Sequence, residues 1–295
     1  MFRVRRLLAP FVLCIALLFS QAQAFTIAWL SDTQNYHNAY KPIFDGMTQW
    51  IADNRAALDI RFVFHTGDVV GSWSSEDQWR QARESMGILS SASIPFLTVC
   101  GNHDIGYRMN YANFLKYVLS LRPASMSQEY GDTGSRYELF SANGRDYIFM
   151  GIAFSNRGPS EDEVNWINGV LRQYSNRAAI IITHSYLKKS ASYTTQGKAI
   201  FEKIVKANPN VFLVLCGHCR DISDKNVQLD DDGDGDPDRT VYAILSNFQG
   251  SKAGGGGYMR ILDFRDDDIY IYTYSPYYDS REYPKGKTEA TVPLP

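Results

Sequence analysis

Short apolar runs bounded by polar residues alternate along the chain with longer segments in which apolar residues recur at helical spacing. Uninterrupted apolar runs of this kind are typical of strands that are buried on both faces. They occupy residues 25–30, 60–65, 94–99, 179–183 and 211–215. Between the first two runs, Ile43, Met47 and Ile51 share one face of an expected helix. The alternation predicts an α/β fold whose central strands are mostly parallel.

Local capping and turn signals extend this prediction. Ser75 and Ser160 each precede an acidic stretch and a helical apolar stripe, which is the pattern of a helix N-cap. Asn143-Gly144 separates two apolar segments and predicts a hairpin turn. Further strands are expected at 241–245, 258–264 and 269–274. These strands are too many and too apolar for one open sheet, so we expect two packed sheets with helices outside them.

The first 24 residues have the pattern of a secretory signal peptide. Arg3, Arg5 and Arg6 form a basic start, an apolar stretch follows over 7–19, and Ala22-Gln23-Ala24 is a small-x-small cleavage site. The apolar stretch is too short to cross a bilayer comfortably. We therefore expect an exported protein, periplasmic or secreted, with no stable membrane span after cleavage. An uncleaved N-terminal anchor is the alternative.

Composition and charge add few constraints. Hydrophobic residues make up 44% and charged residues 21% of the chain, as in ordinary globular proteins. The formal net charge of −2 gives no electrostatic reason to expect a surface that binds nucleic acid. We expect one domain over 25–276, followed by a polar tail over 277–295.

Polar side chains that could bind a metal or a ligand follow the expected strands directly. In α/β sheets, ligands gather beyond the carboxyl ends of the strands. Carboxylate, amide and imidazole groups placed together suit divalent metals such as Mn, Fe, Zn or Mg. The strand-end sequences are Asp32-x-Gln34, Gly67-Asp68, Gly101-Asn102-His103-Asp104, Thr183-His184 and Gly217-His218-x-Arg220. Together they predict a centre for one or two metal ions.

This order of motifs resembles the calcineurin-like metallophosphoesterase superfamily, and the resemblance covers roughly residues 25–276. It implies a four-layer α/β/β/α sandwich of two mixed sheets, and hydrolysis of a phosphoester substrate by a metal-bound hydroxide. Carried over by position, the family pattern assigns one metal to Asp68, Asn102, His184 and His218, and the other to Asp32 and Asp68. It also implies that His103, paired with Asp104, assists the leaving group or stabilises the phosphoryl oxygens.

Two positions depart from the family pattern, and both belong to the same metal. Gln34 stands where the family has His and can still offer a carbonyl oxygen, whereas Arg220 stands where a second His is expected and cannot ligate. We expect that metal to bind weakly, in an oxygen-rich site, or not at all. Arg220 could contact a phosphate oxygen instead. The alternative function is a non-catalytic extracytoplasmic binding protein with a degenerate metal site.

Residues near the motifs leave several alternatives open. His65 lies inside an expected strand and is expected to be structural, while His37 is either a surface residue or a substitute ligand or substrate contact. Asn35, Tyr36, Asn247 and Gln249 could reach the site from neighbouring loops. Loops around Tyr107-Arg108, Asn156-Arg157 and 186–189 are expected to choose the substrate, which the residue types do not identify.

Cys216-Gly217-His218-Cys219 has the spacing of a dithiol redox motif. Such a motif opens a helix in a small domain of its own, whereas here it ends an expected strand of a large domain. With Cys100, the chain beyond the signal peptide has three cysteines, so one disulfide with a free thiol and three buried thiols are both open.

An acidic, glycine-containing stretch at 230–238 resembles the first part of a calcium-binding loop. Its candidate ligands for a structural calcium ion are Asp230, Asp232, Asp234, Asp236 and Asp238. Position 12 of such a loop would be Glu and is Val241 here, so a solvated acidic turn is the alternative interpretation.

Overall fold

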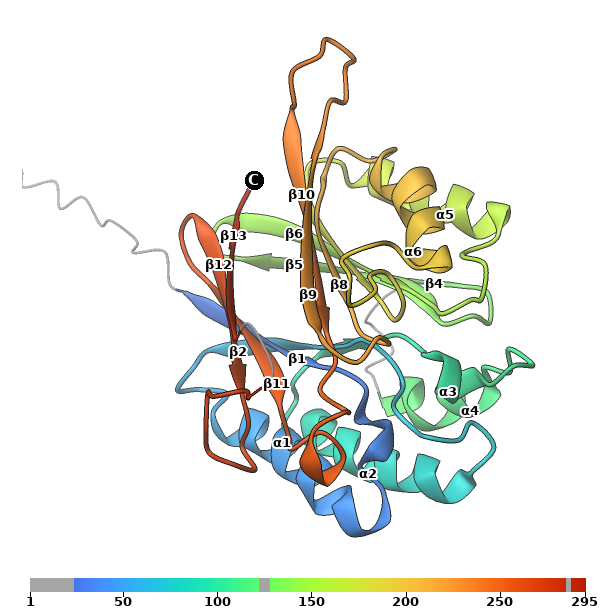
Figure 1. Ribbon diagram of the computed structural model, residues 1–295, viewed down its shortest axis with the longest axis vertical. Coiled ribbons are helices and arrows are strands. Elements are labelled where there is room, and N and C mark those ends of the chain that lie inside the picture. The colour runs from blue at the N-terminus through green and yellow to red at the C-terminus, as the bar shows by residue number, and fades with distance from the viewer. Residues whose placement is uncertain (1–23, 122–127, 285–287) are drawn as a thin grey trace, which may run out of the picture.

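The computed structural model describes residues 24–121, 128–284 and 288–295, which form two sheets with helices against them (Figure 1). The first sheet has the strand order β13 (Glu289–Pro293), β12 (Asp268–Tyr274), β11 (Met259–Phe264), β1 (Phe25–Leu30), β2 (Ile60–His65) and β3 (Phe96–Thr98). The second has the order β4 (Gln128–Tyr130), β5 (Ser135–Ala142), β6 (Arg145–Ile152), β7 (Ala178–Thr183), β8 (Val211–Cys216), β10 (Arg239–Ser246) and β9 (Ile222–Leu229).

The helices connect these strands. They are α1 (Lys41–Asp53), α2 (Glu76–Ser91), α3 (Asn102–Ile105), α4 (Ala112–Tyr117), α5 (Glu161–Gln173) and α6 (Thr195–Ile200). Short helical segments are η1 (Thr33–Asn35), η2 (Asn38–Tyr40), η3 (Leu119–Leu121), η4 (Phe201–Val205) and η5 (Lys252–Gly254). Ser75 and Ser160 cap α2 and α5 as predicted, because their hydroxyls accept the N–H groups of Gln78 and Glu163.

Both sheets are mixed. In the first, β1 runs parallel to β2 and antiparallel to β11, and β2 runs parallel to β3. In the second, β6, β7, β8 and β10 are mutually parallel neighbours, flanked by antiparallel β5 and β9. The parallel strands of each sheet therefore end at a common edge, which is where the polar motifs lie.

Three apolar cores separate four layers. The core between the sheets is rich in aromatic rings, among them Phe25, Phe62, Phe64 and Phe149, all at most 1% exposed. A second core packs α1, α2 and α4 on the outer face of the first sheet, and a third packs α5 and α6 on the second. Figure 1 shows α1 and α2 below the sheets and α5 and α6 above them. The predicted α/β/β/α sandwich is thus confirmed.

Several elements differ from the sequence prediction. The segment expected as a polar tail contains β13, which pairs antiparallel with β12 and extends the first sheet. The edge strand β9 was not predicted, because its alternately half-buried and exposed positions carry few apolar residues. The expected signal peptide lies, but for its last residue, outside the described residues. Among the described residues, no helix combines the length and the apolar character that a bilayer crossing needs.

Candidate metal centre

Side chains from both sheets meet at the common edge formed by the carboxyl ends of the parallel strands. Asp32 follows β1, Asp68 follows β2, and Asn102 opens α3 after β3. His184 and His218 follow β7 and β8 of the second sheet. The convergence predicted from the strand ends is therefore present in the fold.

His184 lies at the middle of this group. Its Nε2 atom lies 3.1 Å from Asn102 Oδ1 and 3.3 Å from Asp68 Oδ2. The Nδ1 atom of His218 lies 3.2 Å from the same nitrogen. Asp68, His184 and His218 also place one ligand atom each within 4.8 Å of one another. These four side chains are those that the family pattern assigns to one metal.

The donor chemistry of these four atoms fits a cation. The Nδ1 atom of His184 lies 2.8 Å from the Thr66 carbonyl oxygen, to which it can only donate, so the neutral ring turns a lone pair toward the group. Burial alone would lower the pKa of His184, but the charges of Asp68 and Asp32 raise it to about 9. The arrangement therefore attracts positive charge to a point between two imidazoles, an amide oxygen and a carboxylate.

His218 supplies the second imidazole in its neutral form. Burial and the neighbouring charge of His184 lower the pKa of His218 to about 4. Its backbone adopts φ 69°, a conformation that few non-glycine residues take. This turn also points its N–H at the carboxylate of Asp32, whose two oxygens both lie 3.2 Å from the nitrogen.

Asp32 stands beside the four-residue group. Its side chain accepts hydrogen bonds from the Ser31 hydroxyl and the His218 N–H. Burial and the charge of Asp68 raise the pKa of Asp32 to about 7 in spite of these bonds and of the opposing charge of His184. A second cation beside these two buried carboxylates would favour the charged form of Asp32.

Glycines allow the loops to approach this closely. A Cβ atom on Gly101 would lie 2.2 Å from Asp68 Oδ1, and one on Gly217 would lie 2.3 Å from Asp32 Oδ2. Real Cβ atoms do not come so near to another atom. Gly101 and Gly217 in the family motifs are thus explained by contact with the neighbouring carboxylates.

His103 lies at the open side of the centre, with an exposed side chain. Its backbone N–H donates to Asp68 Oδ1 at 2.9 Å, and its ring Nδ1 donates to the Gly71 carbonyl oxygen at 2.9 Å. The Nε2 atom is left to face a substrate, as a leaving-group acid or an oxyanion donor requires.

The predicted pairing of His103 with Asp104 is wrong. The carboxylate of Asp104 is fully buried and accepts the N–H groups of Val70 at 3.0 Å and Gly101 at 2.8 Å. Consecutive residues of a helical turn do not face each other, so neighbours in α3 point to different partners. Asp104 therefore joins the loop after β2 to the loop after β3, and burial raises its pKa to about 7.

The two departing positions have different surroundings. Gln34 is buried, and its side-chain N–H donates to the Gln249 side-chain oxygen. Asn247 donates to the His218 carbonyl oxygen at 3.0 Å, so Asn247 and Gln249 do reach the centre. Arg220 is exposed on the turn after β8, and its phosphate contact stays a prediction.

The carbonyl groups of Thr66 and Gly71, which orient the rings of His184 and His103, were not predicted from the sequence. Every residue carries such a carbonyl, so only the fold identifies the ones that act. The ring of Phe154, which packs 5.7 Å from that of His184 and 6.0 Å from that of His218, was missed for the same reason.

His65 is structural, as expected. Its Nδ1 accepts the Gly67 N–H at 3.1 Å, and its Nε2 donates to the Thr33 hydroxyl at 3.0 Å. Burial lowers the pKa of His65 to about 3, so the ring stays neutral. His37 is half-buried, with its Nδ1 3.1 Å from the Asn38 side chain.

The cysteines form no disulfide among the described residues: Cys100 and Cys216 are buried thiols, and Cys219 is half-buried. Burial raises the pKa of the Cys216 thiol to about 12, opposite to the shift of a redox dithiol. These surroundings favour structural thiols.

In the acidic loop, Asp230, Asp232 and Asp238 bring carboxylate oxygens within 4.8 Å of one another, and all three are exposed. Asp234 and Asp236 lie outside that group, and Asp234 accepts the Asp236 N–H at 2.8 Å. Calcium binding stays a prediction.

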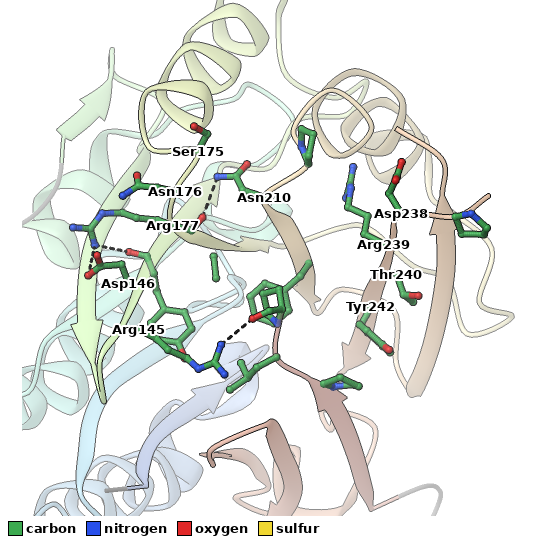
Figure 2. Close-up of a pocket in the computed structure, with 18 of the residues that line it drawn as sticks. Arg145, Asp146, Ser175, Asn176, Arg177, Asn210, Asp238, Arg239, Thr240 and Tyr242 are labelled. Atoms are coloured by element: carbon green, nitrogen blue, oxygen red, sulfur yellow. Dashed lines mark hydrogen bonds and ion pairs between the residues drawn. The ribbon is translucent and has the colours of Figure 1, made fainter. Parts of the chain in front are cut away.

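A separate groove of about 800 Å³ lies at the opposite edge, where β6, β7, β8 and β10 begin (Figure 2). Arg145, Arg177 and Arg239 line it, each already bonded to the protein. None of the predicted metal ligands lines this groove.

Known proteins share both the sequence pattern and the fold. The profile of the calcineurin-like phosphoesterase family matches residues 25–219. The uncharacterized protein YvnB of Bacillus subtilis (strain 168) is 41% identical over 265 residues, which cover 88% of this chain and 20% of that protein, so this chain spans a fifth of that relative's length.

Two solved phosphatases share the fold. A dimetal phosphatase from Danio rerio has a TM-score of 0.62 at 13% identity, covering 91% of this chain and 98% of its own. The purple acid phosphatase PPD1 from yellow lupin (Lupinus luteus) seeds has a TM-score of 0.60 at 12% identity, covering 92% and 55%. At these identities the similarity shows the architecture alone.

Proposed function

We propose that this chain, which belongs to the calcineurin-like phosphoesterase family, is an exported metal-dependent hydrolase of phosphoesters. The observation that carries the proposal is the convergence of ligand atoms on His184 Nε2, with Asn102 Oδ1, His218 Nδ1 and Asp68 Oδ2 all within 3.3 Å. This set leaves acceptor capacity for a cation, because the His184 ring can offer the other three atoms at most one proton, through Nε2. It is suited to a divalent cation.

The residues of the centre would have separate roles. Asp68, Asn102, His184 and His218 would hold one cation, and Asp32 with Asp68 and Gln34 would contribute to a second. Divalent cations, when bound, supply positive charge to phosphoryl oxygens and acidify water. Thr66 fixes the His184 ring, and Asp104 fixes the loops that carry Asp68 and Asn102.

His103 is the residue that we assign to proton transfer. Because its Nδ1–H is bonded to the Gly71 carbonyl oxygen, its Nε2 can face the leaving oxygen of a bound ester. Its backbone N–H, bonded to Asp68, ties the ring's position to that of a metal ligand. The exposed position of the side chain leaves room for a substrate.

Hydrolysis of p-nitrophenyl phosphate and bis(p-nitrophenyl) phosphate tests the proposal, with chelated protein reloaded with Mn, Fe, Zn, Mg or Ca. We expect His184→Asn to lose both cation and turnover. His103→Ala should keep the cation but lose turnover by about 10²–10⁴-fold, the usual contribution of general acid catalysis. His37→Ala is the matched histidine control and should retain both.

Absence of turnover with every cation would favour the non-catalytic binding protein, whereas turnover that survives His103→Ala unchanged would refute the role assigned to His103. Export is tested separately, by expressing the full chain in a bacterium and sequencing the N-terminus of the extracytoplasmic product. Cleavage should yield a chain that begins at Phe25. Full-length protein retained in the cytoplasm would contradict export.

A further inference from the structure

A chain of carboxamide side chains begins at Gln34, which stands where the family pattern has one imidazole of the second metal. Gln34 donates its side-chain N–H to the Gln249 side-chain oxygen. The Gln249 backbone N–H donates to Asn247 Oδ1 at 2.9 Å, and Asn247 Nδ2 donates to the His218 carbonyl oxygen at 3.0 Å. The loop after β10 is thereby bonded both to the loop after β1 and to the turn after β8.

The Gln34 carbonyl oxygen, in contrast, is buried and has no hydrogen-bond partner among the described residues. Gln34 as a whole is 6% exposed. Buried amide oxygens are nearly always paired, so an unpaired one indicates a ligand that the protein atoms do not supply. The bond to Gln249 uses the amide nitrogen and leaves the oxygen as the free end.

Asp32 lies on the same short loop, two residues before Gln34. The turn that carries His218 contacts this loop directly through the His218 N–H, which donates to Asp32. It is linked to Gln34 only through Asn247 and Gln249 of the loop after β10. The loop after β1 thus carries both a carboxylate bonded to this turn and, two residues later, an unpaired carbonyl oxygen.

We infer that Gln249 is a positioning residue that orients the Gln34 oxygen toward a cation shared with Asp32, and that this position selects hard cations. Its protein donors, Asp32, Gln34 and Asp68, are all oxygens, because Arg220 cannot ligate. Oxygen-only sets suit Mg²⁺, Mn²⁺ or Ca²⁺, whereas imidazoles favour Zn²⁺ or Fe. The inference rests on the proposed function, since it concerns the same centre.

Metal binding without substrate provides the test. Chelated protein is titrated with Zn²⁺ and with Mn²⁺ by calorimetry, and bound Mn²⁺ is counted by electron paramagnetic resonance in Zn²⁺-loaded protein. We expect one site that prefers Zn²⁺ and a second that takes Mn²⁺ in preference to Zn²⁺. Gln249→Leu should weaken the second site by about 10–100-fold, the usual effect of losing an orienting partner, and leave the first unchanged.

Two further variants separate orientation from folding. Gln34→Glu brings a charged oxygen that needs no amide orientation, so Gln34→Glu with Gln249→Leu should recover the second Mn²⁺ site. Gln34→His should shift the preference of that site toward Zn²⁺. Gln81→Ala, on the outer helix α2, is the matched control and should bind both ions as the unaltered protein does.

Wild-type affinity for the second Mn²⁺ in Gln249→Leu would overturn the inference, as would a second site that prefers Zn²⁺ or a single bound ion. These outcomes are distinguishable from failure of the proposed function. Two ion classes without phosphoester turnover would refute the function and keep the inference. Turnover with a single bound ion that is unchanged in Gln249→Leu would support the function and refute the inference.

Discussion

Replacing Gly101 by alanine tests whether loop contact sets the position of Asp68. Gly101 has φ −103°, which any residue adopts, so the substitution introduces no backbone strain of its own. The new Cβ atom would lie 2.2 Å from Asp68 Oδ1 and 2.4 Å from Asp68 N. The second contact is with backbone, which cannot rotate away, so the loop after β2 must move.

The size of the effect follows from these distances. Relieving a 2.2 Å contact to the tight limit of 3.0–3.4 Å requires a shift of about 1 Å. Overpacking of this kind costs about 1–3 kcal/mol in unfolding free energy. A misplacement of about 1 Å in a catalytic group can cost about 10²-fold in rate. Because Asp68 also accepts the His103 N–H, the shift would disturb both ligand and proton donor.

Gly87→Ala is the matched control, since Gly87 lies within α2 and a Cβ there has nothing within 4 Å. It should stabilise the protein by about 0.5–1 kcal/mol, the usual gain of alanine over glycine in a helix. Urea denaturation and kcat/KM on an aryl phosphate measure both variants. Gly101→Ala with unchanged stability, cation affinity and turnover would refute the proposed loop contact.

Three other outcomes follow from single side chains. Burial raises the pKa of Glu163 above its ordinary 4.5. The stability that Glu163 contributes is therefore present below pH 4.5 and is lost as the pH rises through its folded-state pKa. In urea denaturation measured across pH, Glu163→Gln should abolish this pH-dependent loss of stability. Cys219→Ser should leave turnover unchanged, because the thiols are unpaired and Cys216 is buried; lost turnover would restore the dithiol interpretation. Calcium added to chelated protein should raise the melting temperature, and Asp230→Asn should cancel the rise; an unchanged melting temperature argues for a plain acidic turn.

Much of the fold could be predicted because its central strands are buried on both faces and therefore read as continuous apolar runs. The hairpin turn was equally clear, since Asn143 and Gly144 both adopt positive φ, 55° and 72°, which few other residue pairs tolerate. The exposed edge strand β9 could not be predicted from the sequence, because its outward positions are polar and its only partner among the described strands is β10.

The candidate metal ligands could be predicted from the sequence, but the groups that orient them could not. Polar residues after apolar strands identify Asp68, His184 and His218, since parallel strands end at one edge. The role of Asp104 depends on where its side chain points. Its place next to His103 in the sequence wrongly suggested that the two side chains pair. The bonds that orient the rings come from backbone carbonyls, which leave no signal in residue identity.

Hydrogen bonds at the centre also explain how three non-glycine residues there keep strained backbone conformations. Asp32, Asp68 and His218 have φ values of 50°, 53° and 69°, a region that costs non-glycine residues free energy. Hydrogen bonds across the rim offset this cost: the His218 N–H from the second sheet reaches Asp32, and the His184 ring reaches the Thr66 carbonyl oxygen of the first. The hydrogen bonds that offset the strain therefore cross from one sheet to the other. A cation held between them would act on the packing of the sandwich as well as on a substrate, because moving either sheet would separate its ligands.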